Sequence, residues 1–168
     1  MDRRHFLKKS LLAGAALAAA PVVVRAAMAG EKNMADAIEK IELSKEECEK
    51  LLSAEQYRIL REAGTEPPRT GPNWDNKADG VYHCAGCDLP LYSSETKYES
   101  GTGWPSFWAP IQENHITLHK DFKLIWPRDE VRCARCDGHL GHVFNDGPQP
   151  TGKRYCMNGH AMVFRAAS

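Results

Sequence analysis

Six cysteines are distributed along the 168-residue chain, and four of them form two pairs with the same spacing. Cys84 and Cys87 enclose two residues, and so do Cys133 and Cys136. Such a turn presents two thiolates from one tight bend, and two turns together supply the four soft ligands of a closed tetrahedral zinc site. We therefore expect one structural zinc ion bound by all four. The alternative is that these pairs are redox dithiols.

The two remaining cysteines lie in contrasting surroundings. Cys48 is part of the mostly anionic segment 46–50, a setting that raises the pKa of a thiol and disfavours the thiolate. Cys156 follows Lys153 and Arg154, and cationic neighbours stabilise a thiolate. The sequence thus favours Cys156 as a nucleophile, against the alternative of a buried core cysteine on a strand.

Two histidines follow the second cysteine pair directly. His139 and His142 lie in the segment Gly-His-Leu-Gly-His, where a metal-bound turn would hold them rigidly, and His160 lies close to Cys156 in sequence. Because imidazole titrates near neutral pH, these side chains can act as acids or bases toward a thiol. A second zinc site is the alternative, but it lacks obvious third and fourth ligands.

A third motif is rich in aromatic residues. Segment 101–108, Gly-Thr-Gly-Trp-Pro-Ser-Phe-Trp, contains Trp104 and two further aromatic rings held by glycines and a proline. Such a segment either forms a corner of the core or lines an apolar pocket.

The predicted secondary structure that positions these residues changes from helices to strands near Pro68. Before it, Ser53 and Gln56 have the spacing of a capping box, and the helix that follows is expected to end at a left-handed cap on Gly64. A weaker box, from Ser44 to Glu47, predicts an earlier helical turn containing Cys48.

After Pro68, short runs of β-branched and aromatic residues alternate with turn residues, which predicts a mainly β domain. The pattern indicates strands at 81–83, 104–108, 116–119, 122–126, 131–132, 142–144, 154–157 and 161–164.

The first 29 residues read as an export signal. Arg3 and Arg4 precede an apolar run, and Ala27-Met28-Ala29 has the small residues of a cleavage site, so the segment resembles a twin-arginine signal peptide. The alternative is an uncleaved membrane anchor. The rest of the chain has 17 basic and 21 acidic residues, a balance that does not suit nucleic-acid binding. We expect a periplasmic protein that binds neither nucleic acid nor, once the signal is cleaved, a membrane.

The motifs together resemble the B-type methionine sulfoxide reductases, which act on the R epimer. The resemblance runs from about Ser53 to Phe164 and rests on several segments in the family's order: 66–74, both cysteine pairs, 101–107, 139–144, 146–148 and 151–158. It implies a mainly β, antiparallel, barrel-like β-tent with a short N-terminal helical segment and a structural zinc site of four cysteines. We expect a signal peptide at 1–29, an extension at 30–52 and the reductase domain at 53–166.

The resemblance also implies roles for individual residues. Cys156 attacks the sulfoxide sulfur and becomes a sulfenic acid, His139 and His142 protonate the departing oxygen and arrange water, and Asn158 completes the catalytic set. Trp104 packs against the S-methyl group of the substrate, and Arg154 lines the site. The expected substrate is oxidised methionine, mainly in peptides and proteins, so that the protein would repair oxidative damage in exported proteins.

One position departs from the family pattern. Thr102 stands where many members carry the cysteine that resolves the sulfenic acid. Regeneration would then use either Cys48 or an external, thioredoxin-like dithiol protein. A monomer is the expected state. A zinc-ribbon-like binding module and a thiol peroxidase are the alternative functions.

Overall fold

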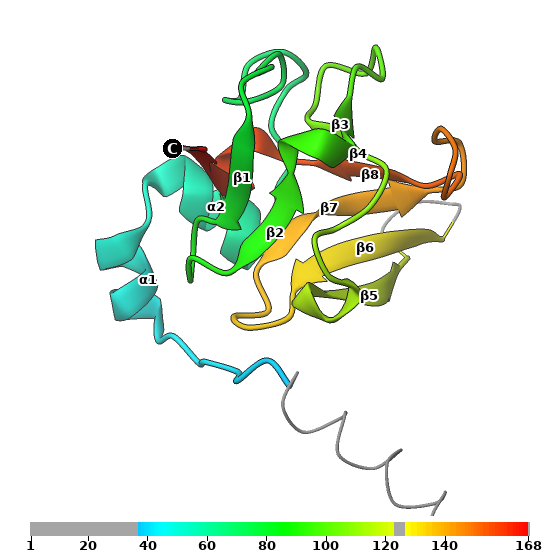
Figure 1. Ribbon diagram of the computed structural model, residues 1–168. Helices are drawn as coiled ribbons and strands as arrows, with labels where there is room; N and C mark the ends of the chain where they lie inside the picture. Colours follow the sequence, from blue (N-terminus) through cyan, green and yellow to red (C-terminus); the bar gives the residue numbers. More distant parts are fainter. Residues whose placement is uncertain (1–36, 123–126, 168) are drawn as a thin grey trace, which may run out of the picture. The chain divides into compact units, whose positions relative to one another are not determined.

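The computed structural model describes residues 37–122 and 127–167, all within one compact unit, Asp36–Ser168. The expected signal peptide and most of the strand expected at 122–126 lie outside the described residues. In the described part, two helices precede nine strands (Figure 1). No helix in these two stretches of chain is both long and apolar enough to cross a membrane.

Both helices begin where the sequence predicts. Helix α1 (Lys45–Leu51) is capped by Ser44 and helix α2 (Ala54–Glu62) by Ser53, each with a complete capping box. In each box the serine hydroxyl accepts a bond of 3.2 Å from the backbone N–H three residues later. The reciprocal bond from the serine N–H satisfies a second donor of the helix end, which fixes where each helix starts.

The end of α2 differs from the prediction. Ala63, not Gly64, adopts the left-handed cap, with φ of 50°. Gly64 is favoured for a different reason, because a Cβ there would lie 2.9 Å from the backbone carbonyl oxygen of Arg58. The prediction of a left-handed Gly64 is therefore wrong, and the close approach of the Arg58 backbone explains the glycine.

The strands form two antiparallel sheets, with the orders β2-β1-β9 and β3-β4-β8-β7-β6-β5. The strands are β1 (Gly80–Cys84), β2 (Pro90–Ser93), β3 (Lys97–Tyr98), β4 (Ser106–Phe107), β5 (Ile116–Asp121), β6 (Arg128–Cys133), β7 (His139–Phe144), β8 (Arg154–Met157) and β9 (Met162–Ala166). Single-turn helices occur at Ser94–Thr96, Glu113–His115 and Gly159–Ala161. The prediction of a mainly β antiparallel fold with short N-terminal helices is confirmed.

Individual strands agree less evenly with the sequence. Strands β2 and β3 were not predicted, because β2 begins at a proline and β3 contains two residues, too few for an alternating pattern. The strand expected at 104–108 shrinks to the two residues of β4.

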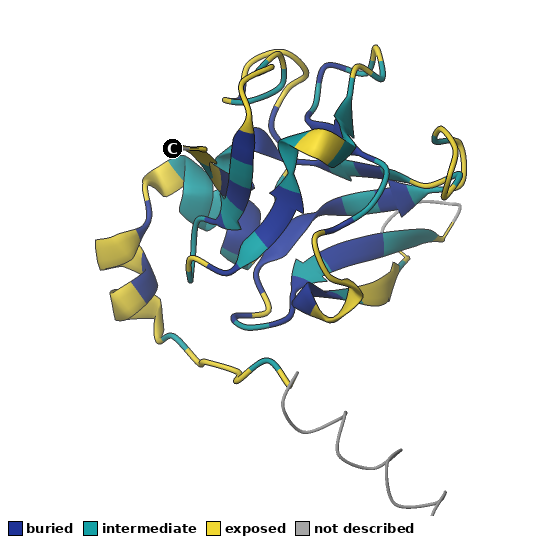
Figure 2. Ribbon diagram, in the orientation of Figure 1, coloured by how far each residue is buried: buried dark blue, intermediate teal, exposed yellow. Residues whose placement is uncertain are grey.

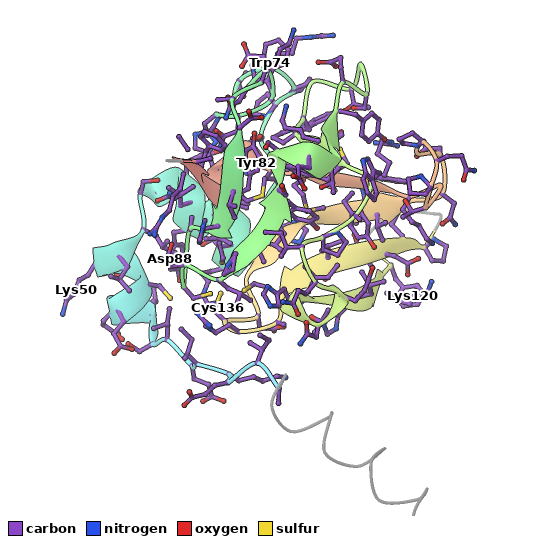
Figure 3. All side chains as sticks on the ribbon, in the orientation of Figure 1. Lys50, Trp74, Tyr82, Asp88, Lys120 and Cys136 are labelled. Carbon is purple, nitrogen blue, oxygen red and sulfur yellow. The ribbon has the colours of Figure 1, made fainter. Side chains whose placement is uncertain are left out.

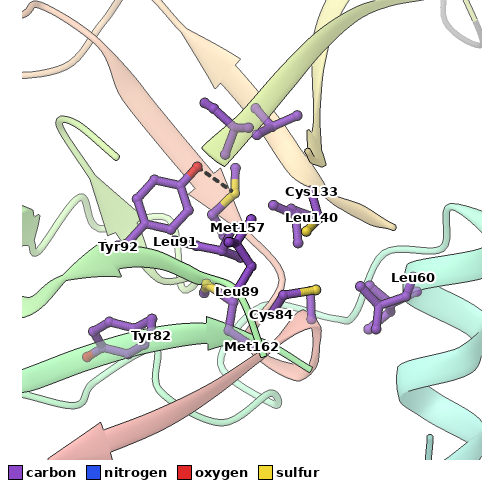
Figure 4. Packing of buried hydrophobic residues seen from close by; sticks show 14 of the residues in the cluster. Leu60, Tyr82, Cys84, Leu89, Leu91, Tyr92, Cys133, Leu140, Met157 and Met162 are labelled. Atoms are coloured by element: carbon purple, nitrogen blue, oxygen red, sulfur yellow. Dashed lines mark hydrogen bonds between the residues drawn. The ribbon is translucent and has the colours of Figure 1, made fainter. Parts of the chain in front are cut away.

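Aromatic side chains join the two sheets. Tyr92 of β2 stacks on Phe107 of β4 with ring centroids 4.5 Å apart, and Tyr82 of β1 meets the same ring edge-on at 5.0 Å. The buried residues form one continuous interior (Figure 2). Figure 4 shows Leu60 of α2 packing toward Cys84 and Cys133, so the helix covers the end of the core that carries the cysteine turns.

Candidate active site

The four paired cysteines meet where β1 and β6 end. Their sulfur atoms all lie within 4.8 Å of one another, and the Cys84–Cys136 and Cys87–Cys133 distances are 3.6 and 3.5 Å. Four sulfurs around a tetrahedral ion, with metal–sulfur bonds of about 2.3 Å, would be about 3.8 Å apart. These separations are far longer than a disulfide bond of about 2.05 Å. The cluster therefore fits one metal ion, as the sequence predicts.

The two cysteine turns are built in the same way. In each turn, the backbone carbonyl of the first cysteine accepts a hydrogen bond from the N–H of the residue four positions later. The backbone N–H of the same cysteine donates to the carbonyl of the residue five positions later. The residue that closes each turn is an aspartate with positive φ, Asp88 at 62° and Asp137 at 55°. Figure 3 places Cys136 on the turn that joins β6 and β7. Identical turns supply equivalent ligand pairs, which suits a symmetrical four-sulfur site.

Cys156 lies in the middle of the larger sheet. Its strand β8 is bonded on one side to β4 and on the other to β7, where its partners are Ser106 and His142. The half-buried thiol contributes to a pocket of about 130 Å³. The pocket is lined by Thr65, Trp104, Arg128, Gly141, His142, Phe144, Cys156, Met157 and Asn158.

The fold thus brings together four of the predicted site residues, Cys156, His142, Asn158 and Trp104. Among the described residues that line this pocket, His139 and Arg154 do not appear. His139 is buried beside His142, with ring centroids 5.4 Å apart. The guanidinium of Arg154 lies 4.4 Å from the centre of the Phe144 ring, which does line the pocket.

A β-bulge places the two histidines on the same side of β7. Residues three apart on a regular strand point to opposite faces. Here Val131 of β6 pairs with Gly141 and Arg132 pairs with His139, which leaves Leu140 as an extra residue. The carbonyl of Leu140 accepts bonds from both the N–H and the side-chain amide of Asn158, at 2.8 and 3.1 Å. The bulge therefore sets the geometry of the pocket.

Each histidine has a carboxylate partner from another strand of the same sheet. Glu130 of β6 lies 2.6 Å from Nδ1 of His139, and Asp121 of β5 lies 2.9 Å from Nε2 of His142. Asp121 also accepts a bond of 2.7 Å from Arg128. The sequence analysis missed these groups, although Arg128, Glu130 and Arg132 alternate along β6, a period-two run of charges that could have indicated them.

Glu66 is the other residue that the sequence analysis left without a role. Its side chain is 1% exposed, and the carboxylate accepts bonds from the N–H groups of Gly159 and His160 and pairs with Nδ1 of His160, at 2.6, 3.0 and 2.8 Å. Its backbone carbonyl accepts the indole N–H of Trp104, and its N–H donates to the side chain of Asn158. Glu66 therefore fixes two walls of the pocket.

The environment of the Cys156 thiol is more apolar than the sequence suggested. Burial raises the pKa of this thiol, although the nearby guanidinium and two hydroxyl groups act in the opposite direction. Arg154 is engaged by Asp146 at 2.8 Å, and Lys153 by Asn145 at 2.6 Å. The net stabilisation of a thiolate expected from these cations is not found, because burial outweighs it.

The other two residues singled out by the sequence lie in different places. The hydroxyl of Thr102 is 4.0 Å from the sulfur of Cys156. Cys48 is the one buried residue of α1, with 1% exposure, and its sulfur lies 3.9 Å from the carbonyl of Leu43. Thr102 is thus next to the sulfur of Cys156, and Cys48 is enclosed in the core beside α2.

Comparisons with known proteins agree with this arrangement. The family model described as the SelR domain matches residues 52–166. A protein named peptide methionine sulfoxide reductase MsrB from Agrobacterium fabrum is 53% identical over 125 residues, covering 74% of this chain and 93% of that protein. Proteins of the same name from Hahella chejuensis and Thioalkalivibrio sulfidiphilus are each 50% identical, over 77% and 75% of this chain and 94% and 92% of theirs. The chain therefore belongs to the SelR domain family, as a B-type methionine sulfoxide reductase.

Proposed function

We propose that this chain reduces the R epimer of methionine sulfoxide, mainly in peptides and proteins, with Cys156 as the nucleophile. The observation that carries this proposal is that Cys156, Trp104 and His142 share one small pocket. A thiol, an indole face and an imidazole are the groups needed to reduce a sulfoxide, to hold its methyl group and to move a proton.

The first step balances without an external proton. Burial raises the pKa of Cys156 and is also the main reason that the pKa of His142 is lowered, so the resting pair is a neutral thiol and a neutral imidazole. As the sulfur of Cys156 attacks, His142 takes the thiol proton and delivers it to the sulfoxide oxygen. A new sulfur–oxygen bond forms on Cys156 as the sulfur–oxygen bond of the substrate breaks, so the thioether leaves and Cys156 keeps the protonated oxygen as a sulfenic acid.

The remaining site residues take supporting roles. Trp104, fixed through its indole N–H, packs against the methyl group of the substrate, and Asn158 orients the reacting group. His139, paired with Glu130, orders water beside His142. Arg154 packs against the Phe144 ring, and this ring lines the pocket in which the substrate would bind.

We infer that the metal held by the four cysteines is zinc. An all-thiolate, four-coordinate set suits this ion and leaves no coordination position open, which indicates a structural role. Bound zinc would hold the turns that precede β7, and hence the start of the strand that carries both histidines.

Regeneration of Cys156 is assigned to an external dithiol protein of the thioredoxin type. Thr102 has no thiol to attack the sulfenic acid, and Cys48 is enclosed in the core. One thiol of the reductant displaces water from the sulfenic acid to give a mixed disulfide. Its second thiol then releases Cys156 as a thiol and leaves the reductant as a disulfide.

The location of this activity rests on the sequence. Residues 1–29 are assigned to a twin-arginine signal peptide, 30–52 to an extension and 53–166 to the reductase domain. The protein would act in the periplasm, as a monomer, on exported proteins damaged by oxidants. Fractionation of cells that express the chain, with and without the Arg3→Lys, Arg4→Lys substitution, tests the export route.

An epimer-resolved sulfoxide assay tests the proposed activity. The metal-loaded protein, Cys156→Ser and Cys48→Ser are incubated with a peptide containing both epimers and with a dithiol protein reductant. We expect loss of the R epimer alone with wild type and Cys48→Ser, and no loss with Cys156→Ser. Full activity of Cys156→Ser would show that Cys156 is not the nucleophile, no loss of either epimer with wild type would support a binding module, and peroxide consumed faster than sulfoxide would support a thiol peroxidase. A slow Cys48→Ser would assign Cys48 to regeneration.

A further inference from the structure

Three hydroxyl groups form a continuous chain beside the sulfur of Cys156. The hydroxyl of Ser100 lies 2.8 Å from that of Thr102 and 2.7 Å from that of Ser106. The hydroxyl of Thr102 is 4.0 Å from the Cys156 sulfur. At the other end, Ser106 donates to the backbone carbonyl of Trp104 at 3.2 Å. The chain therefore runs from the reactive sulfur to the backbone of the pocket wall.

Counting protons fixes the direction of this chain. A hydroxyl has one proton to donate, so Ser106, which gives its proton to the Trp104 carbonyl, must accept from Ser100. Ser100 must then accept from Thr102, and Thr102 in turn must accept from the Cys156 thiol. Every hydroxyl proton is committed when Cys156 is a thiol.

A thiolate has no proton to donate, so the chain must run the other way. Thr102 then donates to the sulfur, Ser100 to Thr102 and Ser106 to Ser100, and the long bond to the Trp104 carbonyl is given up. We propose that Ser100, Thr102 and Ser106 form a reversible hydroxyl relay that bonds the sulfur of Cys156 in both of its protonation states, and more strongly in the thiolate, because a charged acceptor makes the stronger bond. The relay depends on the proposed function in one respect only, which is that the Cys156 sulfur is the reactive atom. Thr102 touches the reacting atom, and the two serines are positioning residues.

Most charged groups around Cys156 are engaged with one another, and the hydroxyls act together with Arg154 on the sulfur. On its own strand, Arg154 is paired with Asp146. On the facing elements, His142 and Arg128 both bond Asp121. Tyr98 on β3 has its pKa raised by burial and remains a neutral phenol near neutral pH. Burial raises the pKa of Cys156, and the Arg154 guanidinium together with hydrogen bonds from Thr102 and Ser106 opposes it.

Site-resolved alkylation tests the relay. The metal-loaded, full-length protein is treated with iodoacetamide from about pH 6 to about pH 10, and modification of the Cys156 peptide is followed by mass spectrometry. Thr102→Val removes the hydroxyl at nearly constant shape, Thr102→Ser keeps it, and Ser100→Ala breaks the chain one residue away. Thr117→Val, on β5, is the matched control.

We expect Thr102→Val to move the alkylation midpoint up by about one pH unit, which lowers the rate at a fixed pH below the midpoint roughly tenfold. Ser100→Ala should shift it in the same direction by less, and Thr102→Ser and Thr117→Val should leave it in place. If Thr102→Val does not fold, the shift in Ser100→Ala decides. An unchanged midpoint in the folded variants overturns the relay. Alkylation needs no sulfoxide. If the variants show the expected shifts but the wild-type protein reduces no sulfoxide, only the proposed function is refuted.

Discussion

Cys156 and His142 occupy directly opposed positions on β8 and β7. Neighbouring strands in a sheet fix the distance between such partners, so the thiol and the imidazole are held together by the backbone rather than by a loop. Asp121 then orients the imidazole through a bond of 2.9 Å to Nε2. The thiol and the imidazole that we propose to exchange a proton are therefore preorganised before any substrate enters.

Removing the imidazole should slow the chemistry without unfolding the protein. We expect His142→Gln to lower kcat/KM for the R-sulfoxide by about 100-fold or more, because proton transfer by a positioned side chain typically contributes that much. His119→Gln, on the exposed end of β5, is the control and should be unchanged. A His142→Gln enzyme within threefold of wild type would remove this residue from the proton path.

A cysteine at position 102 should create an internal resolving thiol. The side-chain oxygen of Thr102 is 4.0 Å from the Cys156 sulfur, and a small rotation can bring two sulfurs at these positions to bonding distance. After one equivalent of sulfoxide, we expect Thr102→Cys to lose two hydrogens by intact mass, whereas wild type retains one oxygen. Thr117→Cys should behave as wild type. A Thr102→Cys protein that keeps the oxygen would contradict the prediction.

Loss of the metal should destabilise the whole domain. Cys136→Ser removes one of four ligands from a cluster that joins the ends of β1 and β6. We expect metal stoichiometry to fall and the free energy of unfolding to drop by about 5 kcal/mol, a fall in Tm on the order of 15 °C. Calorimetry with metal analysis measures both. Cys48→Ala should keep its metal, and a Cys136→Ser protein with wild-type Tm would argue against a structural ion.

Glu130 should make stability depend on pH in the acid range. Burial raises the pKa of Glu130, but its bonds with Arg132 and His139 lower it more, so the pKa in the folded protein lies below the unfolded value. The unfolded chain then binds more protons, and stability rises with pH. The contribution is complete above about pH 5 and is lost as the pH falls through the folded pKa.

Urea unfolding of Glu130→Gln measures this contribution. At pH 7 we expect the variant to be less stable than wild type by about 2 kcal/mol, because the two partners lose a charged acceptor. The difference should shrink toward zero as the pH falls below the folded pKa of Glu130. A difference that stays constant across this range would show that the charge of Glu130 contributes nothing.

Glu66 should affect the pocket as well as stability. Glu66→Gln replaces an acceptor-only carboxylate that takes three bonds from the segment 159–160. We expect a loss of about 2 kcal/mol in the free energy of unfolding and an increase in KM of roughly tenfold, because the carboxylate no longer holds in place the Glu66 backbone groups that bond Trp104 and Asn158. Glu62→Gln, exposed on α2, is the control. An unchanged KM would limit Glu66 to a structural role.

Local signals in the sequence predicted the features that depend on a few neighbouring residues. The serines that cap α1 and α2, the paired cysteines and the strand around Cys156 all follow from residue type and spacing. Features that depend on the partner strand did not follow. The bulge at Leu140 is set by the register of β6 against β7, which no local pattern reveals.

The electrostatics of the site were the least predictable part. From the sequence, Lys153 and Arg154 were expected to stabilise the Cys156 thiolate, yet both are engaged by Asn145 and Asp146. Only the fold shows that burial dominates at this sulfur. The role of Glu66 could not be predicted from local sequence either, because its partners lie more than 90 residues away along the chain.

That separation has a consequence for the order in which the protein is made. On the ribosome, all four metal ligands exist once residue 136 has been added, whereas the partners of Glu66 are the last single-turn helix, Gly159–Ala161. The cysteine cluster therefore precedes the last supports of the pocket in the order of synthesis. The surroundings of Cys156 are complete only after the segment that bonds the Glu66 carboxylate has been made.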